Sequence, residues 1–241
     1  MIYTEPRRGF NLTTFLVLVL FITTSAWGQA DDRAKQIEAA KKEGKLLWYT
    51  STNVTESKPL LDDFEKQYPF IKGEIFRASG EKTLNRIATE TRAGRWDFDL
   101  VTISEVDALQ DAKMLAPYKS PEARSYIPEF KDPNGYWTAV YTNYAPIEWV
   151  NTVNPLVVTL NSAGLSVKPP HPNTARLFID FLLSKPAQQR LRALRRIPAR
   201  PDVEAFSPRM EQTKLKLTTA PSETGAQYRE VVKEFREVFG L

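Results

Sequence analysis

Small polar residues with hydroxyl, amide or guanidinium groups follow three apolar segments in the first half of the chain. The segments end near residues 50, 77 and 103, and a helix-patterned stretch follows each one. A helix that begins there has backbone N–H groups without intrahelical partners in its first turn. The residues that we expect to surround a ligand are Ser51, Thr52, Asn53, Arg77, Ser79, Gly80, Ser104 and Glu105. Together they predict a site for an anion or another oxygen-rich ligand, with the Arg77 guanidinium as a charged fork.

Each of these loops, taken alone, has a simpler interpretation. Ser and Asn are favoured N-cap residues, because their side chains satisfy free N–H groups of the first helical turn. The acidic residues Glu56, Glu81 and Glu105 could bind a hard cation, but they are also ordinary partners of a helix dipole. The combination of three loops favours ligand binding over capping, and no residue is predicted as a metal ligand.

The residue patterns of common enzymes are missing from the sequence. It has no Gly-x-Ser-x-Gly, His-Glu-x-x-His or Gly-x-Gly-x-x-Gly motif and no cysteine. The single histidine, His171, lies in a Pro-Pro-His-Pro run and is interpreted as a helix cap or a surface residue. The carboxylate pairs Asp62-Asp63 and Asp97/Asp99 fit a helix surface and the start of a strand. We therefore predict a protein that is not an enzyme, with no catalytic residues and no cofactor.

A group of arginines near residue 195 raises the possibility of a nucleic-acid surface. Its members are Arg190, Arg192, Arg195, Arg196 and Arg200. No aromatic residues alternate with them to stack on bases, so a solvated helix end explains them better. We expect no nucleic-acid partner. The net charge of +4 suits an anionic ligand, and ordinary surface charge explains it as easily.

Strand and helix patterns alternate in the part of the chain that must position the three loops. After an amphipathic helix over residues 31–44, apolar runs at 45–50, 71–77 and 98–103 predict strands. Apolar residues at helical spacing predict a helix after each of them. This alternation predicts right-handed crossovers and a parallel sheet, so the loops should meet at the carboxyl edge of the sheet.

The second half of the chain has a different pattern. Four prolines interrupt residues 115–135, and β-rich segments follow at 136–144 and 156–167. One long helix is expected to start near His171, followed by an irregular segment over 197–208. A final helix is predicted from the stripe formed by Tyr228, Val231, Val232, Phe235 and Phe239.

The first 30 residues have the pattern of a secretion signal. Arg7 and Arg8 precede an apolar stretch from Leu12 to Trp27, and Gly28-Gln29-Ala30 fits a cleavage site. The paired arginines also loosely fit a twin-arginine signal. The chain is therefore expected to be periplasmic or extracellular. A hydrophobic content of 42% indicates a globular protein, which must rely on its core because it has no disulfide.

Several ordered segments resemble one protein family. They are KLLWYTSTNVTESKPLLDDFEKQYP, IFRASGEKTLNRIATETRAGRWDFDLVTIS, LAPYKSPEA, YWTAVYTNY and PLVVTLNSAGLSVKPPHPNTARLFIDFLLSKPAQQRLRAL. Together they resemble type 2 periplasmic solute-binding proteins of ABC importers, and the ferric-iron-type group most of all. The resemblance implies an α/β fold with one mainly parallel lobe and a small-molecule or metal-chelate ligand, either iron(III)-type or a small oxyanion. It also implies a monomer that delivers this ligand to an ABC permease in the inner membrane.

The chain departs from this family at the place where a second lobe would be inserted. In the family, a strand like 136–144 leads into a second α/β lobe and a strand like 157–167 returns, but here about a dozen residues separate them. We expect a signal over 1–30, the first part of a lobe over 31–135, hinge strands with a shortened remnant over 136–167, and a return to the lobe over 168–241. Tyr141 on the hinge strand is expected to face the cleft, although sheet packing also explains it. The alternative function is a shortened relative that does not transport, either an inactive product or a one-lobe interaction or sensor protein.

Overall fold

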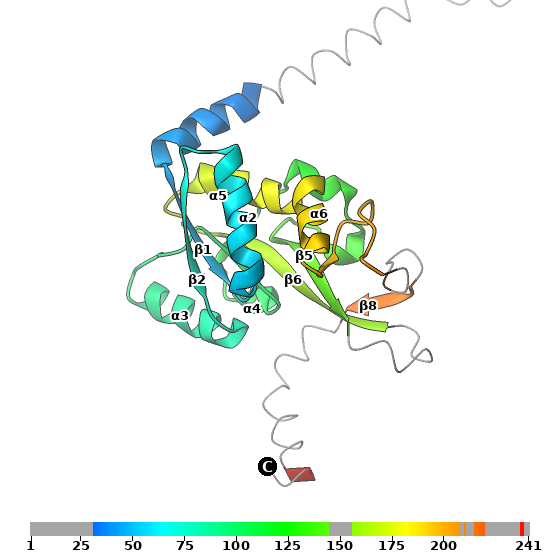
Figure 1. Cartoon of the computed structure of the whole chain (residues 1–241). Helices are drawn as coiled ribbons and strands as arrows, with labels where there is room; N and C mark the ends of the chain where they lie inside the picture. Colours follow the sequence, from blue (N-terminus) through cyan, green and yellow to red (C-terminus); the bar gives the residue numbers. More distant parts are fainter. Residues whose placement is uncertain (1–30, 145–155, 208–209, 211–214, 220–236, 239–241) are drawn as a thin grey trace, which may run out of the picture.

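A computed structural model describes residues 31–144, 156–207, 210, 215–219 and 237–238 of the chain (Figure 1). The predicted secretion signal, the link over 145–155 and the apolar stripe of the predicted final helix lie outside the described residues. The described part is an α/β fold built on one mixed sheet, which confirms the predicted fold class. None of its helices is both long enough and apolar enough to cross a membrane.

The first three strands form the expected parallel unit. β1 (Lys45–Thr50) pairs in parallel with β2 (Lys72–Arg77) on one side and with β3 (Leu100–Ile103) on the other. The connections are α2 (Val54–Gln67) and α3 (Gly80–Arg92), and a further helix over residues 31–43 precedes β1. Figure 1 shows α2 crossing in front of β1 and β2, with α3 lower in the view.

The two strands that were predicted to be hinge strands, and that keep this name below, turn the parallel unit into a mixed sheet. β5 (Trp137–Tyr144) and β6 (Leu156–Ser166) are antiparallel, and β6 lies antiparallel beside β3. The strand order is β2-β1-β3-β6-β5-β7, and β4 and β8 pair with β6 away from this path. The sheet is thus parallel in its first three strands and antiparallel from β3 to β7 along this order, because the chain that returns along β6 enters it in the opposite direction.

The remaining elements are short and surround the hinge strands. They are α4 (Val106–Asp111), β4 (Leu115–Ala116), η1 (Pro121–Ser125), η2 (Pro128–Phe130), α5 (Pro172–Leu183), α6 (Lys185–Ala193), β7 (Ile197–Pro198) and β8 (Leu217–Thr219). β8 runs parallel to the first residues of β6, along the part of β6 that extends past β3. The described residues on both sides of the eleven-residue link over 145–155 therefore belong to one sheet.

Adjacent aromatic residues of β1 enter two separate hydrophobic clusters. Trp48 packs edge-on against Phe178 of α5, with ring centroids 4.9 Å apart, and Phe178 packs in the same way against Phe64 of α2 at 4.8 Å. The next residue, Tyr49, belongs to the cluster that contains Ile87 of α3. Successive side chains of a strand point to opposite faces. Helices therefore bury both faces of the sheet.

The helix predicted to start near His171 is confirmed as α5, but the stretch after Leu183 forms a second helix, α6, and does not continue the first one. Ser184 has an extended backbone with φ −68° and ψ 152°, so it ends α5 and begins α6, where its side chain accepts from the Ala187 N–H. Pro186 is in the first turn of α6. A proline has no N–H to continue the hydrogen bonds of α5, and its ring is tolerated only near the start of a helix.

The interpretation of the arginine cluster as a solvated helix end is wrong for two of its members. Arg200 is buried and contacts Glu122 of η1 and Asp202 through charged hydrogen bonds, and it also donates to the Leu183 carbonyl. Arg196 is largely buried as well and pairs with Glu56. These two guanidinium groups connect elements that are distant in sequence, and a local sequence pattern does not reveal such contacts.

Two charged groups attach the helix over residues 31–43 to the core, and this contact makes a stability prediction. The Arg33 guanidinium lies 2.5 Å from the carboxylate of Asp180 in α5, and Tyr118 and Ser120 donate to the same carboxylate. The Asp180 side chain is 7% exposed, whereas Arg33 is 36% exposed. Arg33→Ala leaves this buried carboxylate without its charged partner, so we expect it to lower the free energy of unfolding by about 2 kcal/mol.

Urea unfolding of the two alanine variants Arg33→Ala and Lys35→Ala tests the contribution of the Arg33–Asp180 ion pair. Lys35 forms an ion pair with Asp31 on the same helix, and both side chains are exposed. We expect Lys35→Ala to have no measurable effect on the free energy of unfolding. Equal losses for the two variants would show that Arg33 contributes only as a helical residue.

Buried tyrosines predict that the protein loses stability at alkaline pH. Burial, helped by Glu90, raises the pKa of Tyr49 to about 12, and burial also raises the pKa of Tyr118, Tyr126 and Tyr141 above the ordinary 10. Between the unfolded and folded pKa values the unfolded chain binds fewer protons, so the free energy of unfolding falls as pH rises above about 10. Urea titrations at increasing pH measure this fall in the free energy of unfolding. In the variant Tyr49→Phe the free energy of unfolding should fall less steeply with pH. A free energy of unfolding that stays constant over this range contradicts it.

Candidate functional site

The loops that follow β1, β2 and β3 lie side by side at the carboxyl edge of the parallel strands. Thr50 is in register with Arg77 of β2 and with Thr102 of β3. The Ser51 N–H donates to the Thr102 carbonyl at 3.0 Å, and the Ala78 N–H donates to the Thr50 carbonyl at 3.1 Å. The structure therefore brings the three predicted loops together. Ligand binding by their residues stays a prediction.

The first loop is held by polar contacts to both hinge strands. The Asn161 Nδ2 of β6 donates to Ser51 Oγ at 3.0 Å, and Thr52 Oγ1 lies 3.4 Å from the Tyr141 hydroxyl of β5. Tyr141 and Asn161 are directly opposite one another in the β5–β6 ladder, so their side chains share a face of the sheet. The Tyr141 hydroxyl therefore lies beside the first loop, and the residue is 3% exposed. The expectation that Tyr141 faces the ligand cleft stays a prediction.

Asn161 also has an unused hydrogen-bond acceptor. The residue is 1% exposed, and its Oδ1 has no hydrogen-bond partner among the described residues. A buried amide oxygen without a partner costs free energy, so such groups are uncommon away from ligand sites and bound water. The oxygen belongs to the same side chain that contacts Ser51, at the meeting point of the first loop and the hinge strands.

The second loop contributes a guanidinium that is directed at the start of α2. Arg77 Nη2 donates to Asn53 Oδ1 at 2.7 Å, and both residues are exposed. Asn53 is the N-cap residue of α2, but its side chain makes no capping hydrogen bond. Ser79 does cap its helix, because its hydroxyl accepts from the Lys82 N–H of α3. Asn53 and Arg77 thus form a polar pair at the site, while Ser79 has the role of an ordinary cap.

The third loop differs from the prediction and brings a negative charge to the site. Glu105, not Ser104, is the N-cap residue of α4, and α4 has only six residues. The Glu105 carboxylate lies against Gly80, so closely that a Cβ at Gly80 would overlap Glu105 Oε2. A carboxylate at the start of α3 complements the partial positive charge of that helix end. Of the predicted helix ends, the start of α3 is therefore already occupied by protein groups. The start of α2, beside Arg77, is the helix end that we expect to accept an anion.

A second arginine, which the sequence analysis assigned to a solvated surface, lies beside Tyr141. The Arg196 guanidinium lies 4.8 Å from the centre of the Tyr141 ring and donates to Glu56 Oε2 at 2.8 Å and to Asn143 Oδ1 at 3.1 Å. Its Nε is buried without a hydrogen-bond partner among the described residues. Arg196 follows α6, far along the chain from the first loop, so no local pattern could have identified it.

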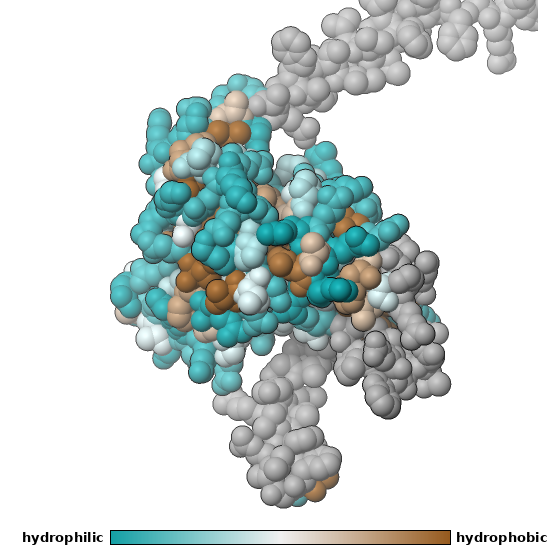
Figure 2. Space-filling model, viewed as in Figure 1, coloured by the Kyte–Doolittle hydropathy of each residue, from teal (hydrophilic) through white to brown (hydrophobic). Residues whose placement is uncertain are grey.

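We call this group of residues the carboxyl-edge site. Its members are Ser51, Thr52, Asn53, Glu56, Arg77, Tyr141, Asn143, Asn161 and Arg196. The view in Figure 2 shows a mostly hydrophilic face, with hydrophobic atoms gathered beside the lower end of α2. Val54, the first residue of that helix, is 60% exposed. The site thus combines hydroxyl, amide and guanidinium groups with an exposed apolar residue at its rim.

The electrostatics around the Tyr141 hydroxyl favour its neutral form, although two arginines lower its pKa. Burial is the largest effect and raises the pKa of Tyr141, which keeps the hydroxyl protonated at neutral pH. The hydrogen bond with Thr52 and the charges of Arg196 and Arg77 lower this pKa, and Glu56 raises it. Both guanidinium groups therefore act on the same hydroxyl. Such an arrangement can bind an oxyanion, but it offers no activated nucleophile.

The histidine and its carboxylate partner lie outside the carboxyl-edge site and already contact each other. Among the residues that the structure describes, no group of three or more His, Cys, Asp and Glu side chains could hold a metal ion. His171 is the N-cap residue of α5, as expected, but its Nδ1 lies 2.9 Å from the buried Asp99 Oδ2 rather than at the free surface. Asp99 precedes β3 and therefore lies at the opposite, amino edge of the parallel strands.

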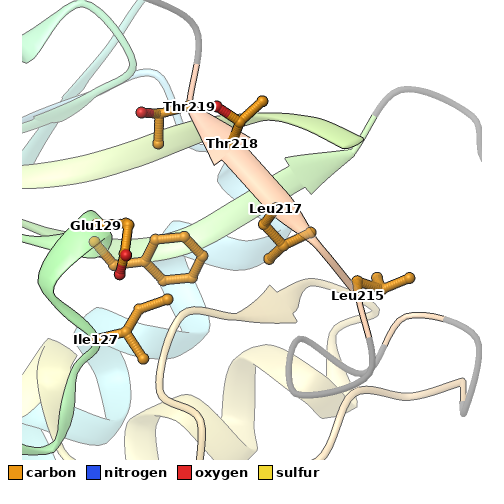
Figure 3. A pocket seen from close by; sticks show the side chains of 7 residues that line it. Ile127, Glu129, Leu215, Leu217, Thr218 and Thr219 are labelled. Atoms are coloured by element: carbon orange, nitrogen blue, oxygen red, sulfur yellow. The ribbon is translucent and has the colours of Figure 1, made fainter. Parts of the chain in front are cut away.

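A pocket of about 200 Å³ lies between η2 and β8, away from the carboxyl-edge site. Figure 3 shows Ile127 and Glu129 on one side of it and the side chains of β8 on the other. Its lining consists of Ile127, Glu129, Phe130, Leu215, Leu217, Thr218 and Thr219. None of the residues predicted from sequence lines this pocket.

Comparisons with known proteins show the fold of the chain. No protein-family model matches it, and no curated protein matches it. Iron-bound HitA from Pseudomonas aeruginosa is similar in structure, with a TM-score of 0.65, 13% identity and coverage of 80% of this chain and 99% of HitA. A Bordetella ferric binding protein is also similar, with a TM-score of 0.61 and 16% identity, and the match covers 81% of this chain and 99% of the Bordetella chain.

A third similar structure contains a different ligand. The periplasmic binding protein AfuA from Actinobacillus pleuropneumoniae, with fructose-6-phosphate bound, has a TM-score of 0.63 and 13% identity, and the match covers 80% of this chain and 98% of AfuA. At these identities the similarity shows the fold alone. The chain has the α/β fold of periplasmic binding proteins.

The charges around Tyr141 allow a prediction that does not need a ligand. Because the Arg196 guanidinium lowers the pKa of Tyr141, Arg196→Met should raise this pKa further. Nuclear magnetic resonance titration of labelled tyrosine measures the change below the pH of unfolding. Arg190→Met is the matched control, since Arg190 pairs with Asp63 on the outside of α2. An equal shift in both variants would mean that Arg196 does not act on the Tyr141 hydroxyl.

Proposed function

We propose that the chain is a non-catalytic solute-binding protein that binds a small oxyanion at the carboxyl-edge site. One observation carries this proposal: the Tyr141 hydroxyl lies 3.4 Å from Thr52 Oγ1 with the Arg196 guanidinium 4.8 Å from its ring, next to a buried Asn161 whose Oδ1 is unused. Guanidinium and hydroxyl groups are preferred partners of carboxylate and phosphate oxygens. The fold of periplasmic binding proteins supports the same function.

The donors and acceptors of the site suggest which oxyanion would fit. Arg77 is exposed and can donate to an anionic oxygen, as can the hydroxyls of Ser51 and Thr52. Asn161 Oδ1 needs a donor, which a ligand hydroxyl group supplies. We infer a ligand that carries both a phosphate or carboxylate and a hydroxyl group, such as a sugar phosphate or a hydroxy acid.

An iron(III)-type ligand fits the site only as a chelate. A bare ferric ion prefers several anionic oxygen ligands, whereas the carboxyl-edge site contains one carboxylate, Glu56, which already pairs with Arg196. In a ferric hydroxy-acid complex the acid supplies the metal ligands and leaves carboxylate oxygens for Arg77. The metal-chelate ligand and the small oxyanion are therefore recognised through the same chemistry.

The chain is proposed to act outside the cytoplasm and to deliver its ligand to an ABC permease in the inner membrane. The signal pattern over residues 1–30 supports export. The fold supports capture of a small solute. Delivery would need only recognition of the loaded protein by the permease, with no chemistry on the ligand, and a monomer is sufficient for it.

Binding should be weak because the chain has only a short link where the family has the second lobe of its ligand cleft. Only the eleven residues over 145–155 join β5 to β6, and a domain normally needs about 50 residues or more. An open face leaves each hydrogen bond of the ligand in competition with water. We expect a Kd of ~1 mM or weaker, which corresponds to about −4 kcal/mol.

Chemical-shift titration of the purified chain with phosphate, citrate, ferric citrate and fructose 6-phosphate tests the proposal. Arg77→Ala should weaken binding about tenfold, because it removes a charged hydrogen bond to the ligand. Arg92→Ala changes the net charge equally at the other end of α3 and should leave affinity unchanged. Equal losses of affinity in the two variants would contradict ligand binding at the carboxyl-edge site. Micromolar affinity for any of these ligands would contradict the weak binding expected of a single lobe.

A second candidate function is a shortened relative that no longer transports. The short link over residues 145–155 favours it, because hinge closure between two lobes is the usual way to trap a solute. Such a protein would be an inactive product or a one-lobe interaction or sensor protein. Permease and ATPase genes beside the gene of this chain would favour transport. A neighbouring gene for a full-length relative would favour the second candidate.

A further inference from the structure

A β-bulge in β5 decides which way Tyr141 points. Ala139 is opposite Ser162 and Tyr141 is opposite Asn161, so Val140 is the extra residue between them. In a regular ladder Val140 would be opposite Asn161 and Tyr141 opposite Leu160, on the other face of the sheet. The extra residue shifts the alternation by one position. The bulge therefore puts Tyr141 on the same face as Asn161, where it meets Thr52 and Arg196.

The carbonyl of the bulged residue is held by one buried side chain. Gln188 of α6 is 0% exposed, and its Nε2 donates to the Val140 carbonyl at 2.9 Å. The same carbonyl also accepts from the Ala199 N–H at a longer 3.4 Å. Because a bulge interrupts the ladder, its carbonyl needs a partner from outside the strand pair.

The other hydrogen bonds of the Gln188 amide are directed at two further chain segments. Nε2 also donates to the Leu182 carbonyl at 2.8 Å, and Oε1 accepts from the N–H groups of Ala199 at 3.0 Å and Arg200 at 3.3 Å. All four hydrogen-bonding positions of the amide are thus used. The side chain joins the end of α5, the bulge in β5 and the segment that follows β7.

The break between α5 and α6 is what makes one of these acceptors available. In a continuous helix, residue 186 would donate its N–H to the Leu182 carbonyl, but residue 186 is proline. The Gln188 amide replaces this donor. An amide side chain at position 188 is needed because it supplies two donors and two acceptors at once.

We propose that Gln188 is a positioning residue of the carboxyl-edge site, which acts on Tyr141 by holding the Val140 bulge. It touches no proposed ligand group itself. Its effect is to keep the Tyr141 hydroxyl beside Thr52 and the ring beneath the Arg196 guanidinium. The relevance of this positioning to binding rests on the proposed function, whereas the coupling between Gln188 and Tyr141 can be measured without any ligand.

The experiment compares wild type with Gln188→Met and Gln188→Glu. Gln188→Met keeps a similar volume and removes all four hydrogen bonds. Gln188→Glu keeps the acceptor for Ala199 and Arg200 but removes the amide donors to Val140 and Leu182, and it serves if Gln188→Met does not fold. We expect both variants to shift the ring signals of Tyr141 and to lose its through-space contacts with Thr52 and Arg196, as measured by nuclear magnetic resonance.

A matched control separates this effect from a general loss of stability. Ile87→Ala removes a fully buried side chain in the cluster on the other face of the sheet, so it should lower the melting temperature and leave the Tyr141 signals unchanged. Unchanged Tyr141 contacts in Gln188→Glu, or the same changes in Ile87→Ala, would overturn the proposal.

Titration of the same variants with phosphate and fructose 6-phosphate connects the coupling to binding. We expect the Gln188 variants to lose as much affinity as Tyr141→Phe, and no further loss when Gln188→Glu and Tyr141→Phe are combined. Additive losses would overturn an action through Tyr141. If wild type binds neither anion while the Tyr141 signals still respond to Gln188, the proposed function fails and the positioning of Tyr141 is upheld.

Discussion

The antiparallel pairing of β6 with β3 is the constraint on which the rest of the structure depends. It places the returning strand directly beside the parallel unit, with Leu100 opposite Leu165 and Ile103 opposite Ser162. The residues of β6 before Ser162 then extend past the carboxyl edge, beyond the end of β3. Because strand pairing has a fixed register, this ladder places Asn161 where its side chain donates to Ser51 in the loop after β1.

Fewer backbone N–H groups are available to a ligand at these helix ends than the polar residues in the sequence predict. Ser79 caps α3 with its own hydroxyl, and the Glu105 carboxylate covers the glycine that begins that helix. Backbone N–H groups in a first turn need partners, and a protein often supplies these partners from its own side chains. The charge that remains for a ligand comes mainly from Arg77 and from Arg196, and the latter shares its charge with Glu56.

Buried polar groups in this protein connect segments that are distant in the chain. The Asp180 carboxylate accepts hydrogen bonds from Arg33, Tyr118 and Ser120. Gln188 joins the end of α5 and the segment after β7 to a β-bulge. Each network has a high cost if one member is removed, because the remaining groups stay buried without partners. Such networks specify one arrangement of the helices around the hinge strands, which apolar packing alone would specify less strictly.

The sequence by itself determined the elements and their order in the first half of the chain. Helical spacing of Leu60, Leu61 and Phe64, and the apolar run at 45–50, are local patterns whose periods differ between helix and strand, so α2 and β1 could be predicted. The convergence of Ser51 and Arg77 followed from the shared edge of parallel strands. The tertiary structure alone decided the mixed direction of the sheet, the β-bulge at Val140 and the position of Arg196. These depend on contacts between residues far apart in sequence, whose partners a local pattern does not contain.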